Sequence, residues 1–158
     1  MCDYSLMGVP NRLANEHEDL VAHRFPTGSM GLAAPVDVNR LARAAVSRPG
    51  GFWTAIKEFF NPPEHAPVAA VCIPPGARLW LRDIPERLQS ALQVGPQEEV
   101  VFTQTGAAVN TYRDAVRFTN GTMLRLQELR EGQRVRVLDL SLAEPLEPFL
   151  EENFAFRQ

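Results

Sequence analysis

The strongest constraint on the fold is a segment, residues 99–140, in which apolar and polar side chains alternate over consecutive runs. Alternation with a period of two is typical of β-strands that bury one face. Short breaks rich in glycine and asparagine are typical of the turns between such strands. The segment therefore predicts four antiparallel strands joined by hairpins: Val100–Thr103, Tyr112–Phe118, Met123–Leu129 and Arg134–Leu140.

The turn at Asn120-Gly121 allows two registers. A two-residue loop would place Arg117 opposite Leu124, whereas a three-residue loop, 119–121 with a left-handed glycine, pairs Val116 with Leu124. The second register separates the two faces better, and a slip of one residue would reverse every side chain. Continued through a four-residue loop at 130–133, it places an apolar set on one face, together with Asp114: Val116, Leu124, Leu126, Val135 and Val137.

The remaining chain alternates short strands and short helices. Two further hairpins are expected, Leu20–Phe25 with Met30–Ala34 and Val68–Ile73 with Arg78–Arg82. Helices are expected at Val38–Ser47 with Asp37 as cap, at Phe52–Phe60, and at Glu86–Leu92 after Pro85.

These elements predict a single α+β domain, 1–158, dominated by β-structure. We expect about eight short antiparallel strands to form an open barrel or sandwich, with two to four short helices. Residues 1–16 are expected to be irregular, and residues 141–158 form an acidic tail with several aromatic side chains.

The sequence carries no targeting or membrane-spanning segment, so we expect a cytoplasmic protein, with bacterial cytoplasm as the default. The formal net charge is −3, which does not favour nucleic acid or anionic lipid as a partner. The chain shows no secretory signal and no apolar stretch of about 18 residues that would span a membrane. Cys2 and Cys72 are therefore expected to be free thiols. The phosphate-binding and dinucleotide glycine motifs are absent, so no nucleotide cofactor is expected.

Cys2 is the leading candidate for chemistry. Removal of Met1 would leave an α-amine beside its thiol, and the amine would activate the thiol as a nucleophile. The same pair is suited to a soft transition metal such as iron, copper or zinc. No metal-binding motif of fixed spacing is present, so such a site must be assembled across the fold, with His23, His65 and Cys72 as possible further ligands.

Two other groups of residues carry alternative functions. The outer face of the predicted sheet carries a row of guanidinium groups, either a solvated surface or an anion-binding site: Arg113, Arg117, Arg125, Arg134 and Arg136. One face of the helix at 52–60 is apolar and predicts either core packing or an interface, with a homo-oligomer as one outcome: Phe52, Trp53, Ile56, Phe59 and Phe60. The sequence thus leaves two classes of function open. The first is a protein, enzymatic or not, with a site centred on Cys2. The second is a noncatalytic binding module or accessory subunit that uses the helix at 52–60 and the tail at 141–158.

Overall fold

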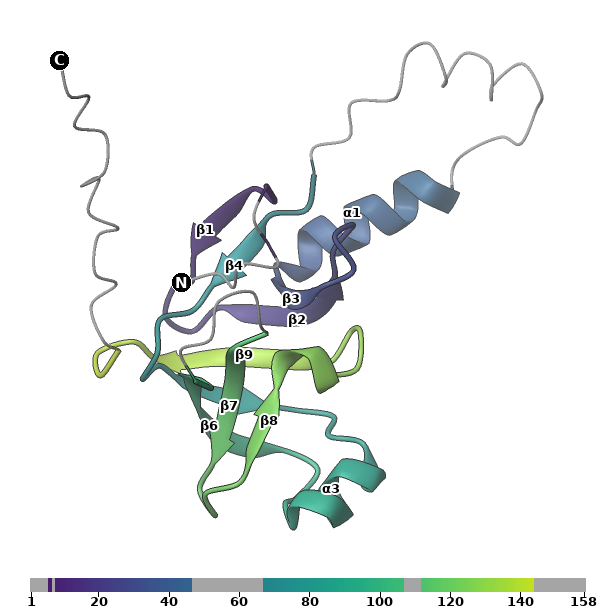
Figure 1. The fold of residues 1–158 in the computed structure, drawn as a ribbon. Helices are drawn as coiled ribbons and strands as arrows, with labels where there is room; N and C mark the ends of the chain where they lie inside the picture. The colour runs from purple at the N-terminus through teal and green to yellow at the C-terminus, as the bar shows by residue number, and fades with distance from the viewer. Residues whose placement is uncertain (1–5, 7, 47–66, 107–111, 144–158) are drawn as a thin grey trace, which may run out of the picture.

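The computed structural model describes residues 6, 8–46, 67–106 and 112–143 of the 158-residue chain. In this part of the chain, nine strands form one sheet in the order β1-β4-β3-β2-β9-β5-β6-β7-β8 (Figure 1). The strands are β1 (Asn11–Leu13), β2 (Asp19–Arg24), β3 (Met30–Ala33), β4 (Ala70–Cys72), β5 (Arg78–Leu81), β6 (Glu98–Gln104), β7 (Asp114–Phe118), β8 (Met123–Arg125) and β9 (Arg134–Asp139). The fold is a β-dominated α+β fold, as predicted.

The strands near the N-terminus confirm one predicted hairpin and correct the expected topology. β2 and β3 form an antiparallel pair in which Ala22 lies opposite Leu32. β4 then pairs antiparallel with β3, but β1 runs parallel to β4, with Arg12 opposite Val71. The sheet is therefore mixed, whereas the sequence predicted antiparallel pairing throughout.

The hairpin predicted between Val68–Ile73 and Arg78–Arg82 is wrong, because β4 pairs with β1 and β3 while β5 pairs with β6 and β9. The connection contains Pro74 and Pro75, which have no backbone N–H to extend a ladder. It is held by β6 instead: the Gly76 N–H donates to the Phe102 carbonyl (2.9 Å), and the Phe102 N–H donates to the Ala77 carbonyl (2.8 Å).

The predicted register at Asn120-Gly121 is confirmed. Val116 lies opposite Leu124 and Arg117 opposite Met123 in the β7–β8 pair. Gly121 has a φ of 86°, the left-handed conformation that the three-residue loop requires. The five apolar residues assigned to the inner face are all buried, and Asp114 is buried with them, as the alternation predicted.

The predicted pairing of the next two strands is wrong, because β9 pairs with β2 and β5 and not with β8. After Arg125 the chain forms a short 3-10 helix, η2 (Leu126–Glu128). Leu126 and Leu129 are both buried, and residues three apart would point to opposite faces of a strand. A helical turn brings both side chains to the core, and this turn ends the strand early.

Two α-helices lie in the described residues, α1 (Pro35–Val46) and α3 (Glu86–Leu92). α3 has the predicted bounds and follows Pro85. α1 begins earlier than predicted, because the carbonyl of Ala34 accepts the N–H groups of Asp37 and Val38; Asp37 therefore lies in the first turn and is not the cap. The helix predicted at 52–60 and most of the tail at 141–158 lie outside the described residues.

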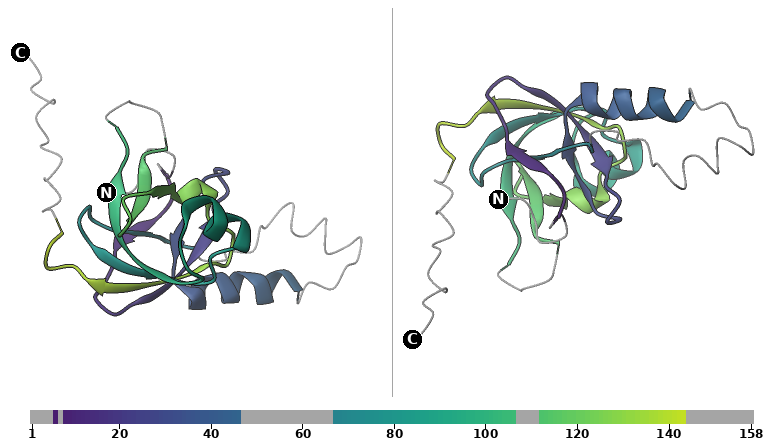
Figure 2. Two further views of the ribbon diagram at one scale, coloured as in Figure 1. Left: turned by 90° about the horizontal axis from the view of Figure 1, so that it is seen from below. Right: turned by 90° about the horizontal axis from the view of Figure 1, so that it is seen from above.

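The sheet is strongly curled (Figure 2). Its main apolar core contains side chains from eight of the nine strands, β2 to β9. Its largest fully buried side chains include Phe102, Leu20, Ile73 and Leu79. A smaller cluster lies on the other side of β3, where Leu6 packs with Phe25 and Ala33. The sheet is not closed by hydrogen bonds in the described residues, since β1 and β8 remain its two edges.

Candidate functional site

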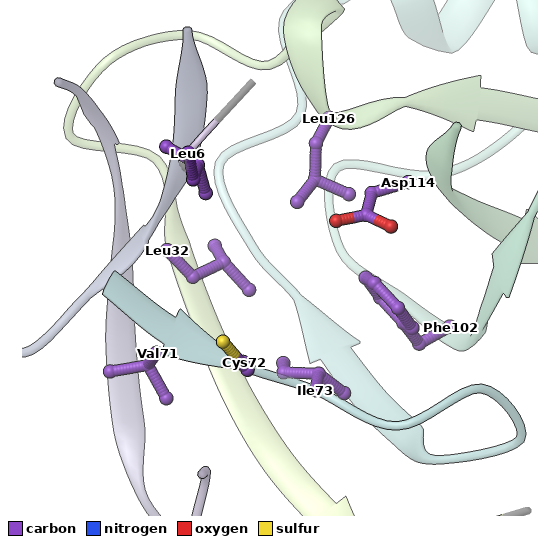
Figure 3. A pocket seen from close by; sticks show the side chains of 9 residues that line it. Leu6, Leu32, Val71, Cys72, Ile73, Phe102, Asp114 and Leu126 are labelled. Atoms are coloured by element: carbon purple, nitrogen blue, oxygen red, sulfur yellow. The ribbon is translucent and has the colours of Figure 1, made fainter. Parts of the chain in front are cut away.

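A small cavity lies where β3, β4, β6 and β7 approach η2 (Figure 3). Its volume of about 10 Å³ is close to what one water molecule requires. Its wall is mostly apolar, and two of its residues carry chemically reactive groups, Cys72 and Asp114. The lining residues are Leu6, Gly31, Leu32, Val71, Cys72, Ile73, Phe102, Asp114 and Leu126.

Cys72 is the last residue of β4 and is 6% exposed. Its sulfur points into the cavity (Figure 3). Cys72 is disulfide-bonded, so the expectation of a free thiol at this position is wrong. That expectation came from the predicted compartment and contained no geometric information. The other cysteine of the sequence is Cys2, which lies outside the described residues.

Asp114 is the first residue of β7 and is 8% exposed. Its carboxylate points into the same cavity, towards the space between Leu32 and Leu126 (Figure 3). Gln104, its cross-strand partner on β6, donates a hydrogen bond from Nε2 to the Asp114 Oδ1 (2.9 Å). A buried carboxyl group in an apolar wall is costly without such a partner, so this hydrogen bond stabilises Asp114 in its place.

His23 lies on the same sheet face as Cys72, with Gly31 between them. His23 is paired with Gly31 in the β2–β3 ladder, and extending the β3–β4 register places Gly31 beside Cys72. The space above Gly31 is filled, because a Cβ added there would lie 2.9 Å from Leu6 Cδ1 and 3.0 Å from Phe25 Cε2. Apolar side chains thus separate the imidazole from the cavity.

The His23 ring is held by two other contacts. It packs edge-on against Phe25 with 5.0 Å between ring centroids. Its Nδ1 lies 3.4 Å from Glu131 Oε1, an ion pair only when the imidazole is protonated, and the two atoms are not aligned for a hydrogen bond. His65, a further predicted ligand, lies outside the described residues. Within the described ranges no three His, Cys, Asp or Glu side chains are close enough together to hold a metal ion.

Three of the five predicted outer arginines pair with carboxylates. Arg134 donates to both oxygens of Asp83 (2.6 and 2.9 Å), and these bonds lower the pKa of Asp83. Arg136 lies 3.9 Å from Asp19, and Arg125 lies 3.6 Å from Glu128. Arg117 is exposed and Arg113 is partly buried. An anion-binding role for this set stays a prediction, and an anion would compete with these carboxylates.

The predicted interface residues at 52–60 lie outside the described residues, but the helix that precedes them is informative. None of the residues of α1 is buried. Val36 is 66% exposed, Leu41 is 40% exposed and Val46 is 86% exposed. This helix therefore presents apolar surface to its surroundings in the described part of the chain. Neither of the described α-helices combines the length and the apolar composition that a bilayer span requires.

Comparison of the chain with protein-family models, with curated proteins and with solved structures produced no match.

Proposed function

We propose that this chain is a small cytoplasmic thiol–disulfide protein whose site is centred on Cys2. The observation that carries the proposal is the disulfide-bonded Cys72 at a water-sized cavity that also receives the buried carboxyl group of Asp114. Cys2 is the other cysteine of the sequence and lies outside the described residues, so its pairing with Cys72 is part of the proposal. Disulfides in a reducing bacterial cytoplasm are usually transient and catalytic or redox-sensing. The site therefore cycles between a disulfide and two thiols.

The cycle needs an oxidant and a reductant from outside the chain. A hydroperoxide oxidises the two thiols to the disulfide, and two electrons pass to the peroxide, which leaves as water and an alcohol, or as two waters from hydrogen peroxide. A dithiol reductant returns two electrons and two protons, and leaves as its own disulfide. Both reactions pass through the thiolate, the reactive form of cysteine.

The reduced form retains the chemistry expected from the sequence. In this form the Cys2 thiol is the nucleophile of the site. The two thiols also provide soft ligands for zinc, copper or iron, with His23 and His65 as further ligands if the apolar side chains over Gly31 move aside. Elemental analysis of tag-free, reduced protein tests this extension, and metal-free protein at full reactivity rejects it.

The direct test is an equilibrium titration of the folded, full-length chain in dithiothreitol redox buffers, followed by intact mass and near-ultraviolet circular dichroism. Reduction adds two electrons and two protons, a mass of two hydrogen atoms per chain, and we expect it to be reversible with the fold retained. The midpoint should lie above about −300 mV, the upper bound typical of purely structural disulfides. A Cys72→Ser variant provides the control without the bond. Reduction that occurs only after unfolding contradicts the proposal.

A second candidate is a noncatalytic binding module or accessory subunit, and a homo-oligomer is its simplest form. The observation that favours it is the absence of any buried residue on α1, directly before the aromatic residues at 52–60. Size-exclusion chromatography with light scattering measures the mass in solution. A dimer that Leu41→Glu dissociates supports this candidate, and a monomer at high concentration rejects the oligomer.

A further inference from the structure

We propose that Arg82, Arg130 and Arg134 form a binding site for a phosphate group, either the free ion or the group of a small phosphorylated molecule. The site lies on the outer face of the sheet, where β5 ends and β9 begins. None of the three arginines lines the cavity beside Cys72. The inference therefore goes beyond the thiol–disulfide function and does not depend on it.

The sheet register places Arg82 and Arg134 side by side. Leu81 lies opposite Val135 in the β5–β9 pair, and both are buried in the core. Because side chains alternate along a strand, the residues next to them, Arg82 and Arg134, point to the outer face. The Arg82 N–H donates to the Arg134 carbonyl (2.9 Å), so the two residues are neighbours across the ladder.

Arg130 reaches the same region through the turn that leads into β9. Its N–H donates to Gln133 Oε1 (3.1 Å), and its carbonyl accepts the Gln133 N–H (2.9 Å). Gln133 is fully buried, so the backbone of Arg130 is fixed while its side chain is exposed. A turn that is already ordered loses less entropy when a ligand binds.

Asp83 is the group towards which the three guanidinium groups converge. Arg134 donates to both of its carboxylate oxygens (2.6 and 2.9 Å) and remains 60% exposed. These hydrogen bonds lower the pKa of Asp83, and the charges of Arg130 and Arg82 lower it further. One carboxylate thus faces three positive charges, which leaves an excess of two.

Arg82 and Arg130 carry this excess. Within the described residues, neither guanidinium group has a hydrogen bond or an ion pair with a carboxylate. Two further carboxylates of this region have other partners. Glu131 Oε1 accepts a backbone N–H at the end of β2 (3.4 Å), and Asp19 lies 3.9 Å from an arginine further along β9.

The ligand class follows from this charge. A phosphate group carries about two negative charges at pH 7. Guanidinium groups bind phosphate oxygens through paired, charge-assisted N–H donors. A phosphate group held by Arg82 and Arg130 neutralises the excess, while Asp83 keeps Arg134 in place. An anion with a single charge would leave half of the excess.

The test is a titration of the full-length chain with inorganic phosphate at constant ionic strength, followed by amide and arginine side-chain chemical shifts in NMR spectra. Glycerol phosphate is titrated separately, and the tighter of the two ligands assigns the group to the free ion or to a monoester. We expect Arg82→Gln and Arg130→Gln each to weaken binding about tenfold, the loss of one charge-assisted hydrogen bond. Arg117→Gln is the matched control and should bind like the wild type, because Arg117 is exposed on β7 and has no ion pair in the described residues.

Asp83→Asn gives the opposite prediction. Asp83 has a φ of 55°, and asparagine accepts this left-handed conformation, so the backbone should be retained. The substitution frees Arg134 and removes a repulsive charge, so phosphate should bind more tightly than in the wild type. No binding of either ligand, equal effects of the three arginine substitutions, or no gain in Asp83→Asn overturns the site and leaves the thiol–disulfide proposal untouched.

Discussion

At the residue scale, Gly31 is important because it has no side chain. It pairs with His23 on β2, lines the cavity beside Cys72 on β4, and lies under Leu6 and Phe25. Its backbone has no positive φ, so conformational freedom is not what requires glycine here. Space is the requirement, because the two nearest contacts that a Cβ would make, 2.9 and 3.0 Å, are shorter than ordinary van der Waals contact.

We therefore expect Gly31→Ala to destabilise the fold by about 1–3 kcal/mol, the usual cost of overpacking a tight interior. Chemical denaturation measures the free energy of unfolding. In a Leu6→Ala background the same substitution should cost less, since the contact at Leu6 Cδ1 is then absent while that at Phe25 Cε2 (3.0 Å) remains. Equal costs in both backgrounds would show that Leu6 does not pack over Gly31.

Asp114 and Cys72 mark what sequence reasoning could and could not reach at the scale of residues. Strand alternation correctly placed Asp114 on the apolar face, where a carboxylate is a poor fit. It gave no sign that Cys72, on a strand far along the chain, would share a cavity with it. Only the tertiary structure shows that the two residues line the same cavity. The mismatch at Asp114 was the available signal, because a polar residue on a buried face needs a reason.

At the scale of elements, Gln127 joins two parts of the sheet that no ladder connects. Its Nε2 donates to the Met30 carbonyl and its Oε1 accepts the Met30 N–H, both at 2.9 Å. Gln127 belongs to η2, which follows β8, and Met30 begins β3. Its side-chain amide thus occupies the place of a neighbouring strand at this end of β3.

Gln127→Ala should cost about 2 kcal/mol of unfolding free energy, since both backbone groups of Met30 then lack their protein partners. The Met30 amide should also exchange with deuterium faster. Gln97→Ala is the control, because its hydrogen bond with Trp80 Nε1 is exposed, and its loss should cost well under 1 kcal/mol. Similar effects of the two substitutions would remove the bridging role of Gln127.

The pairing errors in the sequence-based prediction have one physical origin. Local pattern identified β2, β3, α3 and the β7–β8 register, where neighbours in sequence are neighbours in the sheet. The prediction failed where two strands that follow each other in sequence do not pair in the sheet, at β4–β5 and at β8–β9. Two prolines, and two buried leucines three residues apart, were the local signals for these departures. The partner strands were set by burial over the whole sheet and not by local pattern.

At the scale of the whole molecule, the proposed disulfide joins the start of the chain to β4, in the middle of the sequence. Closing so long a loop restricts the unfolded chain strongly, and such bonds typically stabilise a fold by about 2–4 kcal/mol. We expect reduction, or Cys72→Ser, to lower the free energy of unfolding by that amount without changing the fold. Urea titrations with and without reductant measure it. Equal stability in the two forms would mean that the bond does not constrain the chain.

The most direct measurement of the central claim is a crystal structure of the reduced chain at a resolution that shows ordered water. We predict that Cys72 stays buried beside the cavity as a thiol and that Asp114 still lines the same cavity. An Asp114 carboxylate turned out to solvent, or a cavity filled by apolar side chains between the two groups, would contradict the account.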